Sequence, residues 1–188
     1  MQDALRYNER MRWSLWVVVT VLAAWTAHAQ PPLSPYRMAG LVDESGAQTT
    51  LGAKAQSRLL VVVVLKGPWC SVCTEQLSRL EALRPQLTRL GAHVVGLSAD
   101  SPQAHRKLAA QRKLTMPLLS DQSTAVLRAL GLWRPRWRHP LPALVVFDRC
   151  GKEVGRLEGR GPGMRPESAL LEHLKKLANK PSHCGPSV

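Results

Sequence analysis

The clearest hydrophobic pattern in the chain is an unbroken run of seven apolar residues, Leu59 to Leu65, which contains four consecutive valines. A run of this kind predicts a strand that is buried on both faces of a sheet. Gly67-Pro68-Trp69 interrupts the strand, and Pro85 is expected to kink or end the helix that follows. The apolar face of that helix is predicted by the spacing of Cys73, Leu77, Leu80 and Leu83.

Strands and helices are expected to alternate along the rest of the chain. Ser101-Pro102 has the residue types of a helix N-cap and first turn, and Gly131 suits the position just after a helix end. This order predicts an α/β fold with a central mixed sheet covered by helices on both faces and an extra N-terminal β-hairpin. The expected elements are a hairpin over 38–53 with its turn at 44–46, and strands over 92–97, 144–147 and 152–158. A short extended segment interrupted by Pro117 is expected over 114–119, and helices are expected over 102–112, from Asp121 or Ser123 to Leu130, and over 166–177.

The first residues have the features of an export signal. Three arginines precede an apolar stretch over 13–24, and Ala27-His28-Ala29 then matches the small-x-small pattern of a signal peptidase site. The stretch is short for a membrane span of about 20 residues, which favours cleavage. We expect a periplasmic or secreted protein, membrane-anchored if the signal is retained. The expected segments are a signal peptide over 1–29, a Pro-rich linker over 30–37, a domain over 38–178 and a C-terminal tail over 179–188.

The chain is strongly basic, with a formal net charge of +13 at pH 7. Such a charge is common in nucleic-acid-binding proteins, but here the lysines and arginines are dispersed over several predicted helices, and export removes the protein from nucleic acid. We therefore expect no nucleic-acid partner. A solvated basic surface explains the charge, and attraction to anionic membranes or acidic proteins stays open.

The candidate chemistry is the sequence Cys70-Ser71-Val72-Cys73, at the predicted junction of strand and helix. Backbone N–H groups at a helix N-terminus stabilise a thiolate, so Cys70 is the expected nucleophile. Cys73, one turn later, is the expected resolving residue. The alternatives are an inert bridge or half of a zinc site, but Cys150 and Cys184 form no second CxxC pair. No metal and no cofactor is expected.

The stretch Gly67 to Cys73 resembles the active site of thioredoxin-like proteins in the redoxin and thiol-specific-antioxidant branch, and 91–102, 116–121 and 141–148 resemble further motifs of that branch in the same order. The resemblance covers roughly 38–178 and implies a thioredoxin-like fold. It implies that Trp69 flanks the nucleophile and shields one side of the site. It also implies that Pro142, after Leu141, is a cis-proline that lies against the cysteine pair and presents backbone to a substrate peptide.

Three residues depart from the patterns of this branch. Its peroxiredoxins carry Pro and Thr or Ser upstream of the reactive cysteine, where this chain has Val63 and Gly67. The hydroxyl that orients a peroxide is therefore missing. Many thioredoxins bury an acidic residue on the preceding strand, where this chain has Val64, so Cys73 lacks an obvious base. Lys66 could tune the site, although a solvated lysine at the end of a strand is the simpler interpretation.

Three functions are compatible with these residues. The first is dithiol–disulfide exchange on exported proteins or small-molecule disulfides, fed by a membrane or soluble thiol electron donor. The second is a thiol peroxidase that uses Cys70, with Cys73 as the resolving residue. The third is a Cu(I) chaperone that holds copper between the two thiolates and a histidine such as His139. The oligomeric state is left open.

Histidines and a basic loop complete the list of candidates. The loop Trp133 to His139 precedes the Pro142 segment and should border the active site, either as a partner-docking surface or as a mobile basic loop. The remaining candidate histidines show no ligand spacing and are expected at the surface: His93, His105, His173 and His183.

A structural disulfide between Cys150 and Cys184 is expected from the thioredoxin-like topology. The strand that opens with Pro142 should run away from the active site, which places the turn at Cys150 at the opposite pole. The next strand and the last helix should return the tail to that same pole. An oxidising compartment and an even number of cysteines favour the bridge; two free thiols or a bridge to another chain are the alternatives.

Overall fold

The structure is a computed structural model that describes residues 34–159 and 167–178. The expected signal peptide, most of the expected linker and the tail with His183 and Cys184 lie outside the described residues. Within the described part, no helix has the length and apolar character needed to cross a membrane. Tyr36, which falls in the expected linker, is buried and packs against Phe147 with ring centroids 5.6 Å apart.

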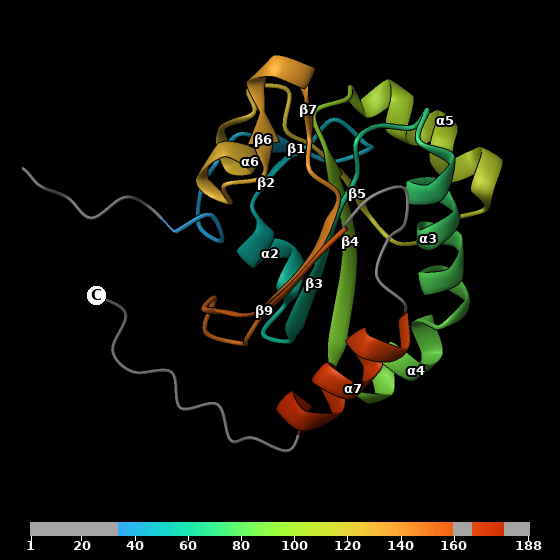
Figure 1. Ribbon diagram of the computed structural model, residues 1–188, viewed down its shortest axis with the longest axis vertical. Coiled ribbons are helices and arrows are strands. Elements are labelled where there is room, and N and C mark those ends of the chain that lie inside the picture. The colour runs from blue at the N-terminus through green and yellow to red at the C-terminus, as the bar shows by residue number, and fades with distance from the viewer. Residues whose placement is uncertain (1–33, 160–166, 179–188) are drawn as a thin grey trace, which may run out of the picture. The chain divides into compact units, whose positions relative to one another are not determined.

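A seven-stranded mixed sheet forms the centre of the domain (Figure 1). Its order is β2-β1-β5-β4-β3-β8-β9, in which β3 is parallel to β4 and antiparallel to β8. The β1–β2 pair is the expected N-terminal hairpin, and its turn is closed by Asp43. The strands are β1 (Leu41–Val42), β2 (Gln48–Thr49), β3 (Leu59–Val64), β4 (Ala92–Ser98), β5 (Leu118–Ser120), β8 (Ala143–Phe147) and β9 (Glu153–Glu158).

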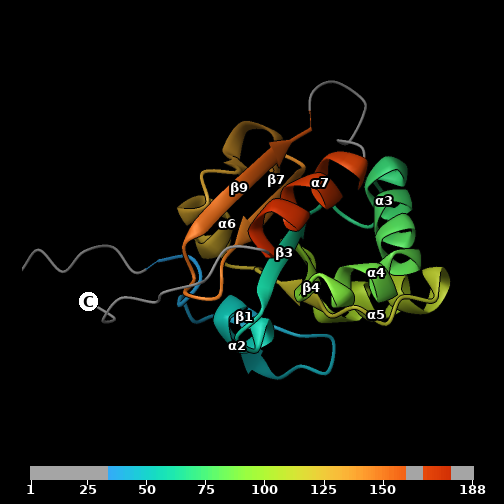
Figure 2. The same ribbon diagram turned by 90° about the horizontal axis from the view of Figure 1, so that it is seen from below.

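The central strand β3 divides the core into two layers, as its apolar run predicts. Alternate side chains of β3 enter opposite clusters, with Val61 and Val63 on one face and Val62 and Val64 on the other. Helices cover both faces (Figures 1 and 2), which confirms the predicted α/β class. The first face is covered by α3 (Ser71–Ala82), α4 (Arg84–Arg89), α5 (Pro102–Arg112) and α7 (Glu167–Ala178), and the second by α2 (Leu51–Ala55) and α6 (Ala125–Ala129).

Two helix boundaries follow the sequence signals closely. Ser101 caps α5, because its hydroxyl accepts a hydrogen bond from the backbone N–H of Ala104 at 3.2 Å. Pro85 lies in the first turn of α4, where the missing N–H costs nothing, and the chain breaks between α3 and α4 at Leu83. Both predictions are confirmed.

Three local predictions are corrected by the structure. Residues 51–53, expected in the first hairpin, belong to α2, because Thr50 Oγ1 accepts from the N–H of Ala53 and starts a helix. The N-cap position of α6 is Thr124, not Asp121 or Ser123, but Thr124 makes no side-chain cap hydrogen bond. The side chains of Asp121 and Ser123 still satisfy the first turn of the helix, because they accept from the N–H groups of Leu127 at 2.8 Å and Ala125 at 3.3 Å.

The third correction concerns the expected irregular loop between α6 and β8. It forms a small antiparallel hairpin in which β6 (Trp133–Arg134) pairs with β7 (His139–Pro140) around a 3₁₀ turn, η1 (Pro135–Trp137). Prolines in place of regular strand residues hid this pairing from pattern analysis.

His105 is buried, so its expected place at the surface is wrong. It lies one turn before Leu108 on the inner face of α5, and the serines that satisfy its ring come from two strands. Nε2 lies 2.8 Å from Oγ of Ser98, and Nδ1 lies 3.1 Å from Oγ of Ser120. Burial lowers the pKa of His105 below its ordinary value, and the negative charges of Asp100 and Glu44 offset this only in part. His93 is half-buried.

This burial predicts a pH-dependent stability. Unfolded His105 takes up a proton below about pH 6.5, whereas the folded ring resists it, so the free energy of unfolding should fall as the pH falls from 7 towards 5. His105→Gln should lower stability at pH 7 by about 1–3 kcal/mol, because the serine hydroxyls lose a matched partner. Its unfolding free energy should then depend less on pH than that of the wild type. Urea unfolding from pH 7.5 to 5 measures both, and an unchanged pH slope in the variant would contradict the assignment.

Candidate active site

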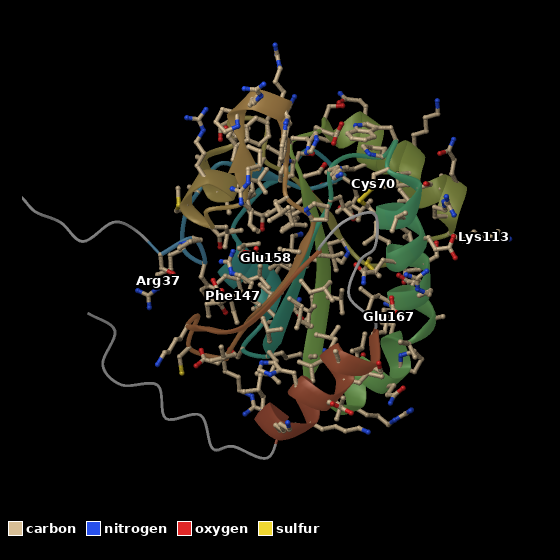
Figure 3. All side chains as sticks on the ribbon, viewed as in Figure 1. Arg37, Cys70, Lys113, Phe147, Glu158 and Glu167 are labelled. Carbon is tan, nitrogen blue, oxygen red and sulfur yellow. A yellow bond between two sulfur atoms is a disulfide. The ribbon has the colours of Figure 1, made fainter. Side chains whose placement is uncertain are left out.

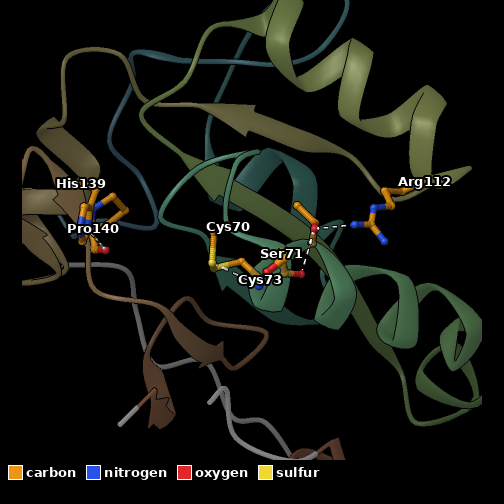
Figure 4. Close-up of a disulfide and its surroundings, with 7 residues drawn as sticks. Cys70, Ser71, Cys73, Arg112, His139 and Pro140 are labelled. Carbon is orange, nitrogen blue, oxygen red and sulfur yellow. Dashed lines mark hydrogen bonds between the residues drawn. A yellow bond between two sulfur atoms is a disulfide. The ribbon is translucent and has the colours of Figure 1, made fainter. Parts of the chain in front are cut away.

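Cys70 is the N-cap of α3, at the point where the buried strand β3 gives way to the helix (Figures 3 and 4). Its Sγ accepts a hydrogen bond from the backbone N–H of Cys73 at 3.3 Å. Its own N–H donates to the carbonyl of Gly67 at 3.1 Å, and its carbonyl accepts from Thr74 at 3.0 Å. The helix N-terminus is therefore aimed at this sulfur, as the sequence predicts.

The two cysteines are joined in a disulfide, with their α-carbons 5.3 Å apart. They differ in exposure: Cys73 is 1% exposed and belongs to the core cluster, whereas Cys70 is only partly buried. Ser71 and Val72 between them are exposed. Of the two cysteines, Cys70 is therefore the more accessible from solvent.

Trp69, which directly precedes Cys70, is 66% exposed. Its indole lies so close to Gly67 that a β-carbon added there would be 2.5 Å from Nε1 of Trp69 and 3.1 Å from Oδ2 of Asp100. The position therefore has no room for a side chain unless the indole moves. The place from which a peroxiredoxin would present its hydroxyl is filled by Trp69.

The hairpin of β6 and β7 borders the site, as the sequence predicts. The ring of His139 meets Trp69 edge-on with centroids 5.7 Å apart, and Trp137 stacks on His139 at 6.0 Å. Nδ1 of His139 lies 3.0 Å from the carbonyl of Pro140 (Figure 4). These three rings, Trp69, His139 and Trp137, are called the aromatic row below.

Pro142 lies at the active-site end of the sheet but is not a cis-proline. Ala143, the next residue, pairs with Val64 at the end of β3. No peptide bond among the described residues is cis, so this part of the resemblance is wrong. The segment is instead fixed by ordinary strand contacts: the N–H of Leu141 donates to Leu132, and the carbonyl of Pro142 accepts from Gly159, both at 2.8 Å. Trans is the default state of an X–Pro bond.

Two polar groups near the pair have no signal in the sequence. Nη2 of Arg112 donates to Oγ1 of Thr74 at 3.1 Å, and that hydroxyl donates to the carbonyl of Ser71 in the first turn of α3 (Figure 4). Asp100, which accepts from Ser98 at 2.8 Å, reaches Gly67. Both arrive from elements distant in the chain. Lys66 is partly exposed.

The remaining site predictions are only partly covered by the structure. Cys150 lies in the turn after β8, and Phe147 at the end of that strand pairs with Leu60, which is the end of β3 away from Cys70 (Figure 3). Cys184 lies outside the described residues, so the bridge stays a prediction. Across the part of the chain that the structure describes, no three His, Cys, Asp or Glu side chains are grouped as metal ligands.

A family model described as the AhpC/TSA family matches residues 35–152 of the chain. The chain belongs to the AhpC/TSA family. The match begins just before the first hairpin and ends just after β8, so it includes the cysteine pair, Trp69 and the aromatic row. The resemblance noted from the active-site motifs is confirmed.

AhpC/TSA relatives of this chain carry two kinds of name. The chain is 28% identical over 132 residues to Peroxiredoxin Bcp of Xanthomonas campestris pv. campestris, covering 70% of this chain and 75% of that protein. It is 25% identical over 112 residues to the thiol-disulfide oxidoreductase ResA of Bacillus anthracis, covering 59% of each. The match thus spans less than two thirds of the length of the ResA relatives. One kind is named as a peroxiredoxin and the other as a thiol-disulfide oxidoreductase, so both kinds of relative are oxidoreductases.

Solved structures confirm the fold. Peroxiredoxin Q of Xanthomonas campestris superposes with a TM-score of 0.67 at 24% identity, covering 80% of this chain and 97% of the other. Enterococcus faecalis AhpC gives a TM-score of 0.68 at 16% identity, covering 74% and 88%. At these identities the likeness establishes a thioredoxin-like, peroxiredoxin-like architecture.

The geometry predicts that the two reduced cysteines react unequally. Cys70 is the more exposed and receives the helix N–H, whereas Cys73 is buried. In the fully reduced protein at pH 6, iodoacetamide should label Cys70 faster than Cys73, by about tenfold or more. Peptide mapping after timed quenching gives both rates. Faster labelling of Cys73 would reverse the assignment of nucleophile and resolving residue.

Proposed function

We propose that this AhpC/TSA-family protein is a thiol–disulfide oxidoreductase that cycles Cys70 and Cys73 between dithiol and disulfide. The observation that carries the proposal is the asymmetry of the pair. One sulfur is partly exposed at a helix N-terminus and hydrogen-bonded by a backbone N–H, and the other is buried within bonding distance of it. This is the arrangement that disulfide exchange needs at its two successive steps.

The reaction follows from the geometry. The Cys70 thiolate attacks one sulfur of a substrate disulfide, the substrate S–S bond breaks, and the first substrate thiolate leaves and takes up a proton. Cys73, having lost its proton to solvent, then attacks Sγ of Cys70, which releases the second substrate thiol. Two electrons pass to the substrate, and Cys70 and Cys73 are left as the disulfide. A thiol donor returns the pair to the dithiol by the same steps in reverse.

Electrostatic interactions stabilise Sγ of Cys70 in both directions of the reaction. The N–H of Cys73 stabilises negative charge on Sγ of Cys70 both when it attacks and when it is the leaving group. The Arg112 guanidinium reaches the first turn of α3 through Thr74 and adds positive charge to that end of the helix. Trp69 is proposed to line the substrate contact. Leu141 and Pro142 are proposed as a fixed wall rather than as a backbone partner, because Leu141 N–H and Pro142 carbonyl are already hydrogen-bonded.

Exported protein disulfides are the proposed substrates, with a membrane or soluble thiol as the electron donor. This part rests on the signal-like first 29 residues.

Peroxide reduction is the competing function, and the similarity to Peroxiredoxin Bcp favours it. Gly67 argues against it, because it offers no hydroxyl and its side-chain space is filled by Trp69. A peroxide bound beside Cys70 would lack the donor that polarises its O–O bond.

Cysteine variants test the proposal. Cys70→Ser should reduce a model protein disulfide no faster than buffer does, because the attacking sulfur is gone. Cys73→Ser is the matched control: it keeps Cys70 and should accumulate a mixed disulfide with the substrate, visible by non-reducing mass spectrometry.

The rate of reaction with hydrogen peroxide tests the competing peroxidase function on the same proteins. The reduced wild type should react with hydrogen peroxide no faster than an ordinary exposed thiolate. A rate constant for peroxide orders of magnitude above that, together with slow disulfide reduction, would replace the proposed function by a thiol peroxidase.

A further inference from the structure

In the described part of the chain, the exposed large hydrophobic side chains lie in or next to the CxxC sequence or are linked to it through ring contacts. The large hydrophobic side chains that stand out in solvent are Trp69 at 66% exposed, Trp137 at 59% and Val72 at 39%. Val72 lies inside the CxxC sequence, Trp69 precedes it, and Trp137 joins Trp69 through His139. Exposed tryptophans in one place are typical of surfaces that bind another molecule.

The same place carries uncompensated positive charge. The segment 133–140 holds Arg134, Arg136 and Arg138 and no acidic residue. Nη1 of Arg134 donates a hydrogen bond to the carbonyl of Gly131 at 2.8 Å. Arg136 and Arg138, which precede and follow Trp137 in the chain, are exposed. The ion pairs found among the described residues involve none of these three arginines. A carboxylate from outside would meet two unpaired guanidinium groups.

The hairpin holds the backbone that carries these groups in a fixed arrangement. Trp133 pairs with Pro140 and Arg134 with His139, and Arg138 at φ 52° closes the turn by donating its N–H to Pro135. The hairpin is tied to the domain by the Leu141–Leu132 hydrogen bond. A surface held in place before binding loses less conformational freedom when a partner docks.

We propose that the β6–β7 hairpin docks the polypeptide that carries the disulfide to Cys70, and that this polypeptide is acidic and presents an aromatic or apolar residue near its cysteine. The inference rests on the proposed function and names its substrate class. The aromatic row extends at most roughly 12 Å from Trp69 to Trp137. An extended chain rises about 3.3 Å per residue, so the acidic residues should lie about three to four positions from the cysteine.

A polypeptide suits this surface better than an anionic membrane does. The row of rings ends at the redox-active pair, and a membrane has no disulfide to place there. Alternating guanidinium and indole groups match carboxylates and an apolar side chain within one short segment.

Charge-matched peptides test the proposal. Three symmetric peptide disulfides share a cysteine and a tryptophan four residues away, and the tryptophan is flanked by Asp, Asn or Lys. The reduced full-length protein should reduce the Asp peptide with a kcat/KM about tenfold or more above that of the Lys peptide, because opposite charges speed encounter. The gap should shrink in about 0.5 M NaCl.

Hairpin variants locate the effect. Arg136→Glu with Arg138→Glu should abolish or invert the preference for the Asp peptide. The control, Lys175→Glu with Lys176→Glu on exposed positions of α7, makes the same change in net charge and should keep the preference. Trp137→Ala should slow all three peptides by raising KM. Each rate is normalised to reduction of hydroxyethyl disulfide by the same variant.

Several outcomes would overturn the inference. Equal rates for the three peptides would do so, and so would equal effects of the α7 and hairpin reversals. If vesicles of anionic phospholipid bind the wild type but not the hairpin variant while peptide rates stay equal, the surface docks membranes instead. Failure of the wild type to reduce hydroxyethyl disulfide at all would count against the proposed function itself.

Discussion

The hydrogen bond from the N–H of Cys73 to Sγ of Cys70 depends on where β3 ends and α3 begins. β3 is buried along its whole length between β4 and β8, so its last residues have almost no freedom of position. The turn at Gly67 then brings Cys70 to the N-cap, where a sulfur takes the place that a serine or aspartate oxygen usually fills. A packed core thus holds a reactive atom at a helix end, and the chemistry of the site follows from that position.

The surroundings of the pair decide which reactants suit it. Trp69 lies on Gly67 and fills the space of a peroxide-orienting side chain, and it extends through His139 to Trp137. Gly67 itself offers no hydroxyl to orient a peroxide, and we propose that the aromatic row enlarges the surface offered to a larger reactant. The fold is thus that of peroxiredoxins, whereas the site is one for which we propose disulfide exchange.

The parts of this structure that the sequence could predict are those encoded by local pattern. The valine run of β3, the Ser101 cap and the break at Pro85 each act within a few residues, and the structure confirms them. The local errors are the start of α2 at Thr50 and the β6–β7 hairpin, and other features were missed because their partners lie on other elements. His105 is buried because Ser98 and Ser120 come from two other strands, and Arg112 reaches Thr74 across 38 positions. Pro142 was expected to be cis by family likeness, but its peptide bond is trans.

A redox titration of Cys70–Cys73 against glutathione tests most directly whether the pair is a working redox centre. The account predicts a single reversible transition with a two-electron slope of about 30 mV per tenfold change in ratio, lost in Cys70→Ser. A pair that neither glutathione nor a stronger dithiol reductant such as dithiothreitol reduces in the folded protein would be an inert structural bridge, and that result would contradict the account.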